Sequence, residues 1–151
     1  MTPSEAVLRR AVPEDAPALA DVHLRSRAAA PMPPSVHPDS DCEPWLRGHL
    51  EDPAQETWLA EVDGAPVAYL RLTPTWLDDL YVTPSYAGQG LGTALLDLAK
   101  TLRPDGFGLW VFEVNTPARA FYRRHGLVEV ERTDGRANEE RDPDVRLAFR
   151  P

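Results

Sequence analysis

The stretch from Leu80 to Thr93, LYVTPSYAGQGLGT, combines residue types and spacing that suit a binding site. A strand pattern ends at Val82, and Pro84 follows it. Glycines then alternate where a helical pattern begins, at Gly88, Gly90 and Gly92. Glycine lets the backbone approach an anion closely, and the first turn of a helix offers unpaired N–H groups at its positive end. This spacing predicts a turn that binds a pyrophosphate.

Two common phosphate-binding motifs do not fit the stretch. A dinucleotide-binding fold needs GxGxxG after an early strand, whereas the glycines here follow GxGxG after an expected antiparallel meander. A Walker loop needs a lysine in GxxxxGK[ST], and this stretch has none. The remaining alternative is a tight strand-to-helix turn without a ligand.

A mixed α/β sheet is expected to position this turn. Periodicity and turn residues predict strands at 7–12, 57–62, 67–72, 76–82, 109–114, 127–131 and 145–149. They predict helices at 13–30, 39–50, 90–102 and 116–124. The sheet should contain antiparallel hairpins and one βαβ crossover from 76–82 to 109–114. A Pro-rich loop, 30–38, and an acidic loop, 134–144, complete the chain.

Composition excludes several classes of protein. The 151 residues fit one domain, 1–151, and carry a net charge of −8, which opposes nucleic-acid binding. No apolar run approaches the ~18 residues of a membrane span. The N-terminus lacks an apolar signal core, and Cys42 is the only cysteine. A cytoplasmic protein without disulfides or a multi-cysteine metal site is expected.

Two blocks of the sequence together resemble the GNAT family of N-acetyltransferases. The lead-in LYVTP (80–84) and AGQGLG (87–92) are similar to the family's Leu-Tyr-Val-x-Pro and [Q/R]-x-x-G-x-[G/A]. Ala87 departs from the usual Arg or Gln, which removes one side-chain contribution to the pyrophosphate turn. Residues 115–127, NTPARAFYRRHGL, are similar to N-x-x-A-x-x-F-Y-x-x-x-G-F, with Leu127 replacing the last Phe. The resemblance covers essentially the whole chain.

The resemblance implies the acyl-CoA N-acyltransferase fold: a mixed, mostly antiparallel seven-stranded sheet, splayed between its fourth and fifth strands and flanked by four helices. It implies acetyl-CoA as co-substrate and direct attack by a primary amine. The residues that it assigns to cofactor binding are Leu80, Tyr81, Val82, Gly88, Gln89, Gly90, Leu91, Gly92, Thr93, Asn115 and Ala118.

The resemblance also implies two catalytic residues. Tyr122 matches the position of the general acid that protonates the departing thiolate. Asp78 is favoured as the base for the acceptor ammonium, because the family often places an acid two residues before the Leu of Leu-Tyr-Val. Asp79 is the alternative, since a bulge in this strand would exchange the faces. Glu113 or a chain of waters could also serve.

Other polar residues are weaker candidates. His37 and Asp39 lie on the Pro-rich loop, which lines the acceptor entrance in the family. Arg123 and Arg124 could meet the 3′-phosphate of the cofactor. The other histidines, His23, His49 and His125, lack ligand-like spacing, so no metal is expected. Cys42 has no partner that would make it a nucleophile.

The sequence predicts an acetyl-CoA-dependent N-acetyltransferase whose acceptor is a small cationic amine. The alternatives are a protein N-terminal or lysine acetyltransferase and a non-catalytic acyl-CoA-binding module. No nucleic-acid or membrane partner is expected, and a homodimer is left open.

Overall fold

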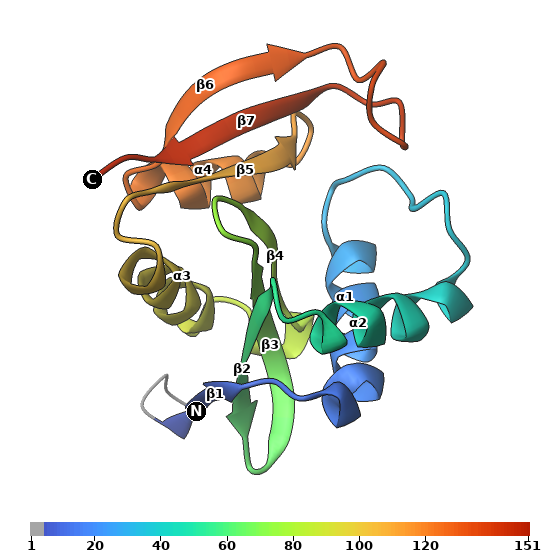
Figure 1. Cartoon of the computed structure of the whole chain (residues 1–151). Coiled ribbons are helices and arrows are strands. Elements are labelled where there is room, and N and C mark those ends of the chain that lie inside the picture. The colour runs from blue at the N-terminus through green and yellow to red at the C-terminus, as the bar shows by residue number, and fades with distance from the viewer. Residues whose placement is uncertain (1–4) are drawn as a thin grey trace.

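The computed structural model describes residues 5–151, which form two antiparallel sheets with helices packed against them (Figure 1). The first sheet has the order β1-β2-β3-β4. Its strands are Val7–Arg10 (β1), Glu56–Val62 (β2), Ala65–Leu72 (β3) and Leu77–Val82 (β4). Asp63 and Gly64 connect β2 to β3 with φ of 53° and 80°, the left-handed conformations that a tight hairpin turn requires.

The second sheet is built from the C-terminal part of the chain in the order β5-β7-β6. Its strands are Phe107–Phe112 (β5), Val128–Thr133 (β6) and Asp144–Phe149 (β7). A parallel bridge between Trp76 and Gly108 joins the two sheets, while β4 and β5 otherwise diverge. The seven expected strands all form, but the expected continuous sheet is divided into four and three strands at the predicted splay.

Helices cover both faces of the first sheet (Figure 1). Helices α1 (Ala16–Ala29) and α2 (Cys42–Glu51) lie on one face, and α3 (Leu91–Leu102) lies on the other. Side chains alternate along the strands: Leu59 and Tyr69 pack with α1 and α2, whereas Ala60 and Leu70 belong to the core that includes α3. Helix α4 (Thr116–Arg124) packs its Tyr122 into the same core as the second sheet.

Some elements begin or end away from their expected residues. A 3-10 turn, Pro13–Asp15, precedes α1, so the α-helix starts at Ala16. A second 3-10 turn, Asp39–Asp41, precedes α2. Strand β1 ends at Arg10, and β5 begins at Phe107 because this buried side chain already pairs with Phe149 of β7. The order of elements is the expected one, and its β4–α3–β5 crossover is parallel.

The close contact between the sheets predicts that Gly108→Ala destabilises the protein. A Cβ at Gly108 would lie 2.8 Å from Cζ3 of Trp76, so the indole ring or the strand must shift. Overpacking of this kind costs about 1–3 kcal/mol. Gly48→Ala is the matched control, because a Cβ there meets nothing within 4 Å and α2 gains about 0.5–1 kcal/mol. Urea unfolding of both variants measures the difference; equal stabilities would contradict the contact.

Candidate active site

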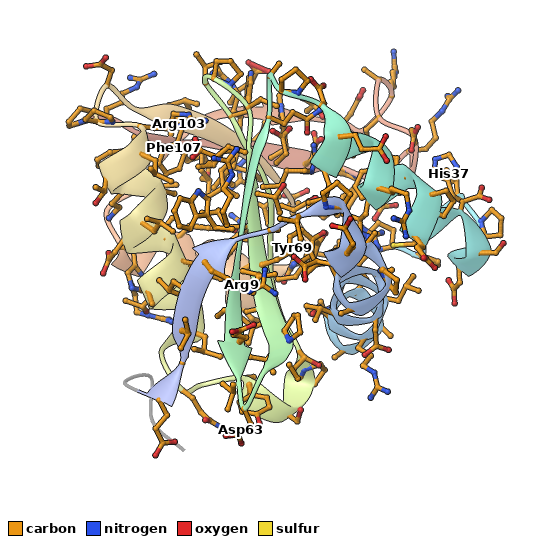
Figure 2. The ribbon with its side chains drawn as sticks, turned by 60° about the horizontal axis from the view of Figure 1, so that its bottom comes forward. Arg9, His37, Asp63, Tyr69, Arg103 and Phe107 are labelled. Atoms are coloured by element: carbon orange, nitrogen blue, oxygen red, sulfur yellow. The ribbon has the colours of Figure 1, made fainter. Side chains whose placement is uncertain are left out.

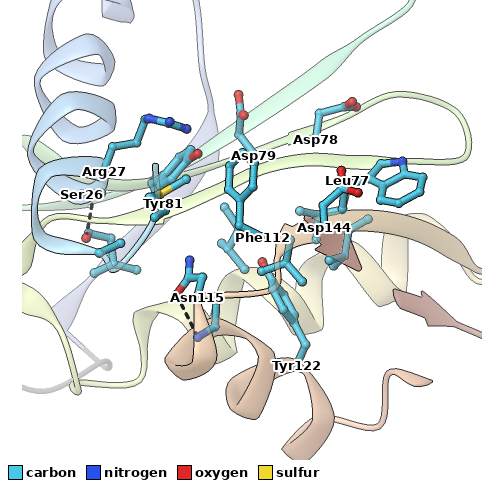
Figure 3. Close-up of a pocket in the computed structure, with 18 residues that line it drawn as sticks. Ser26, Arg27, Leu77, Asp78, Asp79, Tyr81, Phe112, Asn115, Tyr122 and Asp144 are labelled. Carbon is cyan, nitrogen blue, oxygen red and sulfur yellow. Dashed lines mark hydrogen bonds between the residues drawn. The ribbon is translucent and has the colours of Figure 1, made fainter. Parts of the chain in front are cut away.

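A cavity of about 310 Å³ lies where β4 and β5 diverge (Figure 3). Strand β4 contributes its whole length, 77–82, and β5 contributes Leu109 to Phe112. Helix α1 and the following loop contribute Ser26, Arg27, Ala30 and Met32. Asn115, Ala118, Tyr122 and Asp144 complete the lining. The division of the sheet therefore creates a cleft with strand backbone on both sides.

The pairing of β4 leaves part of its backbone facing this cleft. The Thr83 N–H donates to the Val67 carbonyl oxygen at 2.9 Å, so Ala68 and Val82 form a non-hydrogen-bonded pair. Leu80, two residues before Val82, forms a non-hydrogen-bonded pair with Leu70 in the same way. The backbone N–H and C=O groups of Leu80 and Val82 consequently point away from β3, as the sequence prediction of cofactor binding requires. The Ser26 hydroxyl donates to the Val82 carbonyl oxygen at 2.8 Å, which leaves Leu80 with both groups available.

A bulge in β4 places two consecutive acids beside the cleft. Arg71 pairs with Asp79 and Leu72 pairs with Leu77, so Asp78 is the additional residue. Asp78 is exposed, and its carboxylate accepts a hydrogen bond from the Thr73 hydroxyl at 2.9 Å. Asp79 is buried, yet both acids line the cavity. The bulge removes the strict alternation that would have sent one acid to each face.

Asp79 belongs to a buried polar network. Arg71 Nε lies 2.7 Å from Asp79 Oδ2, and the two side chains are only 8% and 6% exposed. The Tyr69 hydroxyl donates to the same oxygen at 3.1 Å. His23 Nδ1 lies 2.8 Å from the Tyr69 oxygen, and Tyr69 sits between the sheet and α1 (Figure 2). Gln55 accepts a hydrogen bond from Arg71 at 2.9 Å.

Tyr122 lies under the cleft with its hydroxyl directed toward the space between β4 and β5 (Figure 3). The ring is buried, and burial raises the pKa of its phenol above the ordinary value. Its hydroxyl has no hydrogen-bond partner within residues 5–151. A protonated phenol without a protein partner is free to donate to a group that enters the cleft.

A second cavity of about 900 Å³ adjoins the first, since Arg27, Met32, Asp78, Asp79 and Tyr81 line both. Its wall is rich in acids, which come from the 3-10 turn before α2, from β4 and from the acidic loop between β6 and β7: Asp39, Asp41, Asp78, Asp79, Glu139 and Glu140. Arg27 is the one Arg or Lys of the described chain in this lining. The larger cavity therefore favours a cationic occupant.

The Pro-rich loop and the acidic loop meet over this cavity. His37 Nε2 lies 2.9 Å from Glu139 Oε2, across 102 positions of the sequence. In Figure 2, His37 lies beside the N-terminal end of α2, on the side of the molecule away from β1. The expected positions of His37 and Asp39 at the cavity entrance are consistent with this arrangement. Cys42 also lines the cavity, but burial raises the pKa of its thiol to about 11, so the thiol stays protonated at neutral pH.

The glycine turn lies at the start of α3 and outside both cavities. Gly88 and Gly90 have φ of 75° and 85°, conformations that glycine adopts readily. No side chain caps the helix, and its first internal bond runs from the Ala94 N–H to the Gly90 oxygen. Gly92 lies against α4 instead, because a Cβ at this position would be 3.4 Å from Phe121 Cζ. The open helix start fits a phosphate group.

Other predicted residues occupy varied positions. Asn115 is the N-cap of α4, and its side chain accepts a hydrogen bond from the Ala118 N–H at 3.4 Å. Both residues line the cleft. The Thr93 hydroxyl pairs with His125 Nε2, and the Leu91 side chain is buried in the core. Glu113 lines neither cavity and forms an ion pair with Arg132.

Sequence reasoning missed the buried network. Arg71 is the one charged residue in the expected strand 67–72, and Asp79 lies in the next strand. A charge in each of two paired apolar strands signals a buried ion pair, but the pairing partner depends on register. His23 carried no such signal, because its partner Tyr69 lies 46 residues away.

Within residues 5–151, no three His, Cys, Asp or Glu side chains gather in a way that could hold a metal ion. In the same residues, no helix is both long enough and apolar enough to cross a membrane.

Comparison with known proteins identifies the family. Residues 23–127 match the model of the acetyltransferase (GNAT) family, and the chain belongs to this family. It is 36% identical over 83 residues to the peptidyl-lysine N-acetyltransferase YjaB of Salmonella typhimurium, covering 54% of this chain and 57% of that protein. The chain spans about half the length of the curated relatives that it matches, 57% and 46%.

Solved structures agree with the fold. A GCN5-related N-acetyltransferase from Rhodopseudomonas palustris has a TM-score of 0.82 and 25% identity, covering 100% of this chain and 99% of that one. The PaiA N-acetyltransferase from Thermoplasma acidophilum, solved in complex with coenzyme A, has a TM-score of 0.74, 18% identity and coverages of 97% and 99%. The family and the mixed fold predicted from the two sequence blocks are confirmed.

The buried ion pair predicts that Arg71→Leu destabilises the protein by about 3–5 kcal/mol, because Asp79 would keep a buried charge without its partner. The matched control is Arg25→Leu, which breaks a pair with Asp21 whose side chains are 67% and 61% exposed. That change should shift stability by less than about 0.5 kcal/mol. Guanidinium unfolding at pH 7 compares them. A loss for Arg71→Leu no larger than the control would show that the pair contributes nothing to folding.

Proposed function

We propose that this chain is an acetyl-CoA-dependent N-acetyltransferase whose acceptor is a small cationic amine. Membership of the GNAT family supports the reaction class. The proposal of a small cationic acceptor depends on the acid-lined cavity, which opens onto the cleft between β4 and β5. A cationic amine entering it would reach Asp78 and Asp79 at the junction of the two cavities.

The residues present fit acetyl-CoA, which would supply the electrophilic acetyl thioester. The N–H groups at the start of α3, in the turn 88–93, would bind its pyrophosphate. The backbone of Leu80 and Val82 would hold the pantetheine arm beside Tyr81, and the Leu80 N–H would polarise the thioester carbonyl. Asn115 and Ala118 would line the opposite side of the cleft.

Tyr122 would protonate the sulfur as the carbon–sulfur bond breaks. Burial keeps the phenol protonated at neutral pH, although it also makes the phenol a weaker acid. The same burial raises the pKa of the thiol that forms, so the phenol and the thiol remain close in acidity and the proton can be transferred. Asp78 would attract the acceptor ammonium, because it forms no ion pair with a basic side chain within residues 5–151, whereas Asp79 is paired with Arg71.

A lysine side chain of a peptide is the second candidate acceptor. It is favoured by the similarity to YjaB, a peptidyl-lysine N-acetyltransferase. The contact between His37 and Glu139 argues for a small molecule, since it joins the two loops over the cavity and narrows the path for a peptide backbone.

A thiol-release assay tests the proposal. The chain and acetyl-CoA are incubated with diamines, polyamines and amino-sugars on one side and with lysine peptides on the other. Faster release with small polycations supports the proposed acceptor. A preference for peptides would select the second candidate, and tight acetyl-CoA binding without release for any amine would indicate a non-catalytic acyl-CoA-binding module.

Tyr122→Phe should lower kcat by about 100- to 10,000-fold while leaving acetyl-CoA affinity nearly unchanged. The phenol is needed by the charge that develops on the sulfur and much less by the bound thioester. Tyr86→Phe removes a phenol outside both cavities and serves as the control. Steady-state kinetics and a binding titration measure the two effects. An unchanged kcat would assign Tyr122 to packing alone.

Gly90→Glu should abolish acetyl-CoA binding, because its carboxylate would stand at the helix start proposed for the pyrophosphate. Gly64→Glu is the matched control. It adds the same charge at a glycine with a similar φ of 80° and with nothing within 4 Å of the added Cβ. Isothermal titration with acetyl-CoA gives the comparison. Micromolar binding by a folded Gly90→Glu protein would remove the glycine turn from the cofactor site.

A further inference from the structure

His23 occupies the wall of the larger cavity, close to its junction with the cleft. It extends from α1 and lies against Tyr81, with ring centroids 4.8 Å apart. Tyr81 lines both cavities. The Trp45 ring also contacts the imidazole edge to face, with centroids 5.5 Å apart. An acceptor held near Asp78 would therefore meet the imidazole of His23 in the same cavity.

The hydrogen bonds of the buried network fix the tautomer of His23. The single Tyr69 hydroxyl proton is donated to Asp79, so the Tyr69 oxygen must accept from His23 Nδ1. The proton of the neutral imidazole is thus on Nδ1, and Nε2 carries the lone pair. Nε2 has no hydrogen-bond partner in the described chain, and no buried side-chain nitrogen or oxygen there lacks one. Nε2 is therefore accessible to the cavity.

The electrostatic surroundings favour a neutral imidazole. Burial lowers the pKa of His23 below its ordinary value, Arg27 and Arg71 lower it further, and Asp79 acts in the opposite direction. The other titratable side chains near the ring are Tyr69 on β3 and Tyr81 on β4, whose rings contact the imidazole, and Cys42 on α2, which lines the same cavity. A neutral imidazole with an open Nε2 can accept a proton at pH 7.

We propose that His23 is the base of the reaction, accepting a proton at Nε2 from the acceptor ammonium while Tyr69 and Asp79 hold its ring. This rests on the proposed acetyl transfer. The ammonium loses one proton to His23, which passes it to water, and the nitrogen lone pair then forms the bond to the acetyl carbon. When the carbon–sulfur bond breaks, Tyr122 gives its proton to the sulfur. The nitrogen then loses its second proton, which restores the phenol. Asp78 holds the charge of the acceptor but does not take its proton.

Kinetics separate these roles. His23→Gln should lower kcat by about 100-fold or more and remove the acidic limb of its pH profile, with acetyl-CoA affinity intact. Asp78→Asn should instead raise KM for the amine. Arg25→Gln, a change of an exposed side chain of the same helix that lines neither cavity, should leave kcat unchanged. Imidazole added to His23→Ala should restore part of the rate.

Nitrogen NMR of the wild-type imidazole gives a readout independent of turnover: His23 should be neutral with its proton on Nδ1 at pH 7, and Tyr69→Phe should disturb this tautomer. An active wild type with an equally active His23→Gln, or an Nε2–H tautomer, would overturn the assignment of the base. A wild type without amine-dependent thiol release would overturn the proposed function itself, whatever the tautomer.

Discussion

The buried ion pair between Arg71 and Asp79 is the interaction on which the site depends. Two charges withdrawn from water are tolerated only when close geometry and further hydrogen bonds compensate for lost hydration. The structure provides these through Tyr69 and Gln55, and through Trp45, whose ring centroid lies 5.1 Å from the guanidinium carbon. The pair therefore fixes β3, β4 and α2 relative to one another, and Tyr69 extends the network to α1.

The bulge beside this pair and the division of the sheet act together. Asp78 bulges out of β4 as Asp79 turns inward to Arg71, so consecutive acids reach the junction of the two cavities. Beyond Trp76 and Gly108, β5 diverges, and the backbone of Leu80 and Val82 faces the cleft instead of a neighbouring strand. An unpaired strand edge is usually a liability. Here the edge is enclosed by α1 and α4, which makes it accessible to a small ligand rather than to another sheet.

The sequence was sufficient for the features that depend on local residues. The glycine turn, the seven strands, the crossover and the family follow from periodicity and from two short blocks. The choice between Asp78 and Asp79 did not, because the bulge depends on which residues of β3 and β4 pair. The role proposed for His23 was equally hidden, since it depends on Tyr69 and Asp79, which lie on β3 and β4 and meet α1 only through tertiary contacts. Glu113 shows the converse: its position in the sequence suggested a base, but the fold pairs it with Arg132 outside both cavities.

One physical cause prepares the two groups proposed to move protons. Burial disfavours the charged form of any side chain, and the charged form of a phenol is an anion whereas that of an imidazole is a cation. The pKa of Tyr122 is therefore raised and that of His23 is lowered, so at neutral pH the phenol keeps a proton to give and the imidazole has a lone pair to accept one. Environments that separate two pKa values in this way are how enzymes assign acid and base roles near pH 7. Helix α4 supplies the phenol to the cleft, and α1 supplies the imidazole to the larger cavity. Strand β4 lines both cavities, so the two groups lie on either side of it.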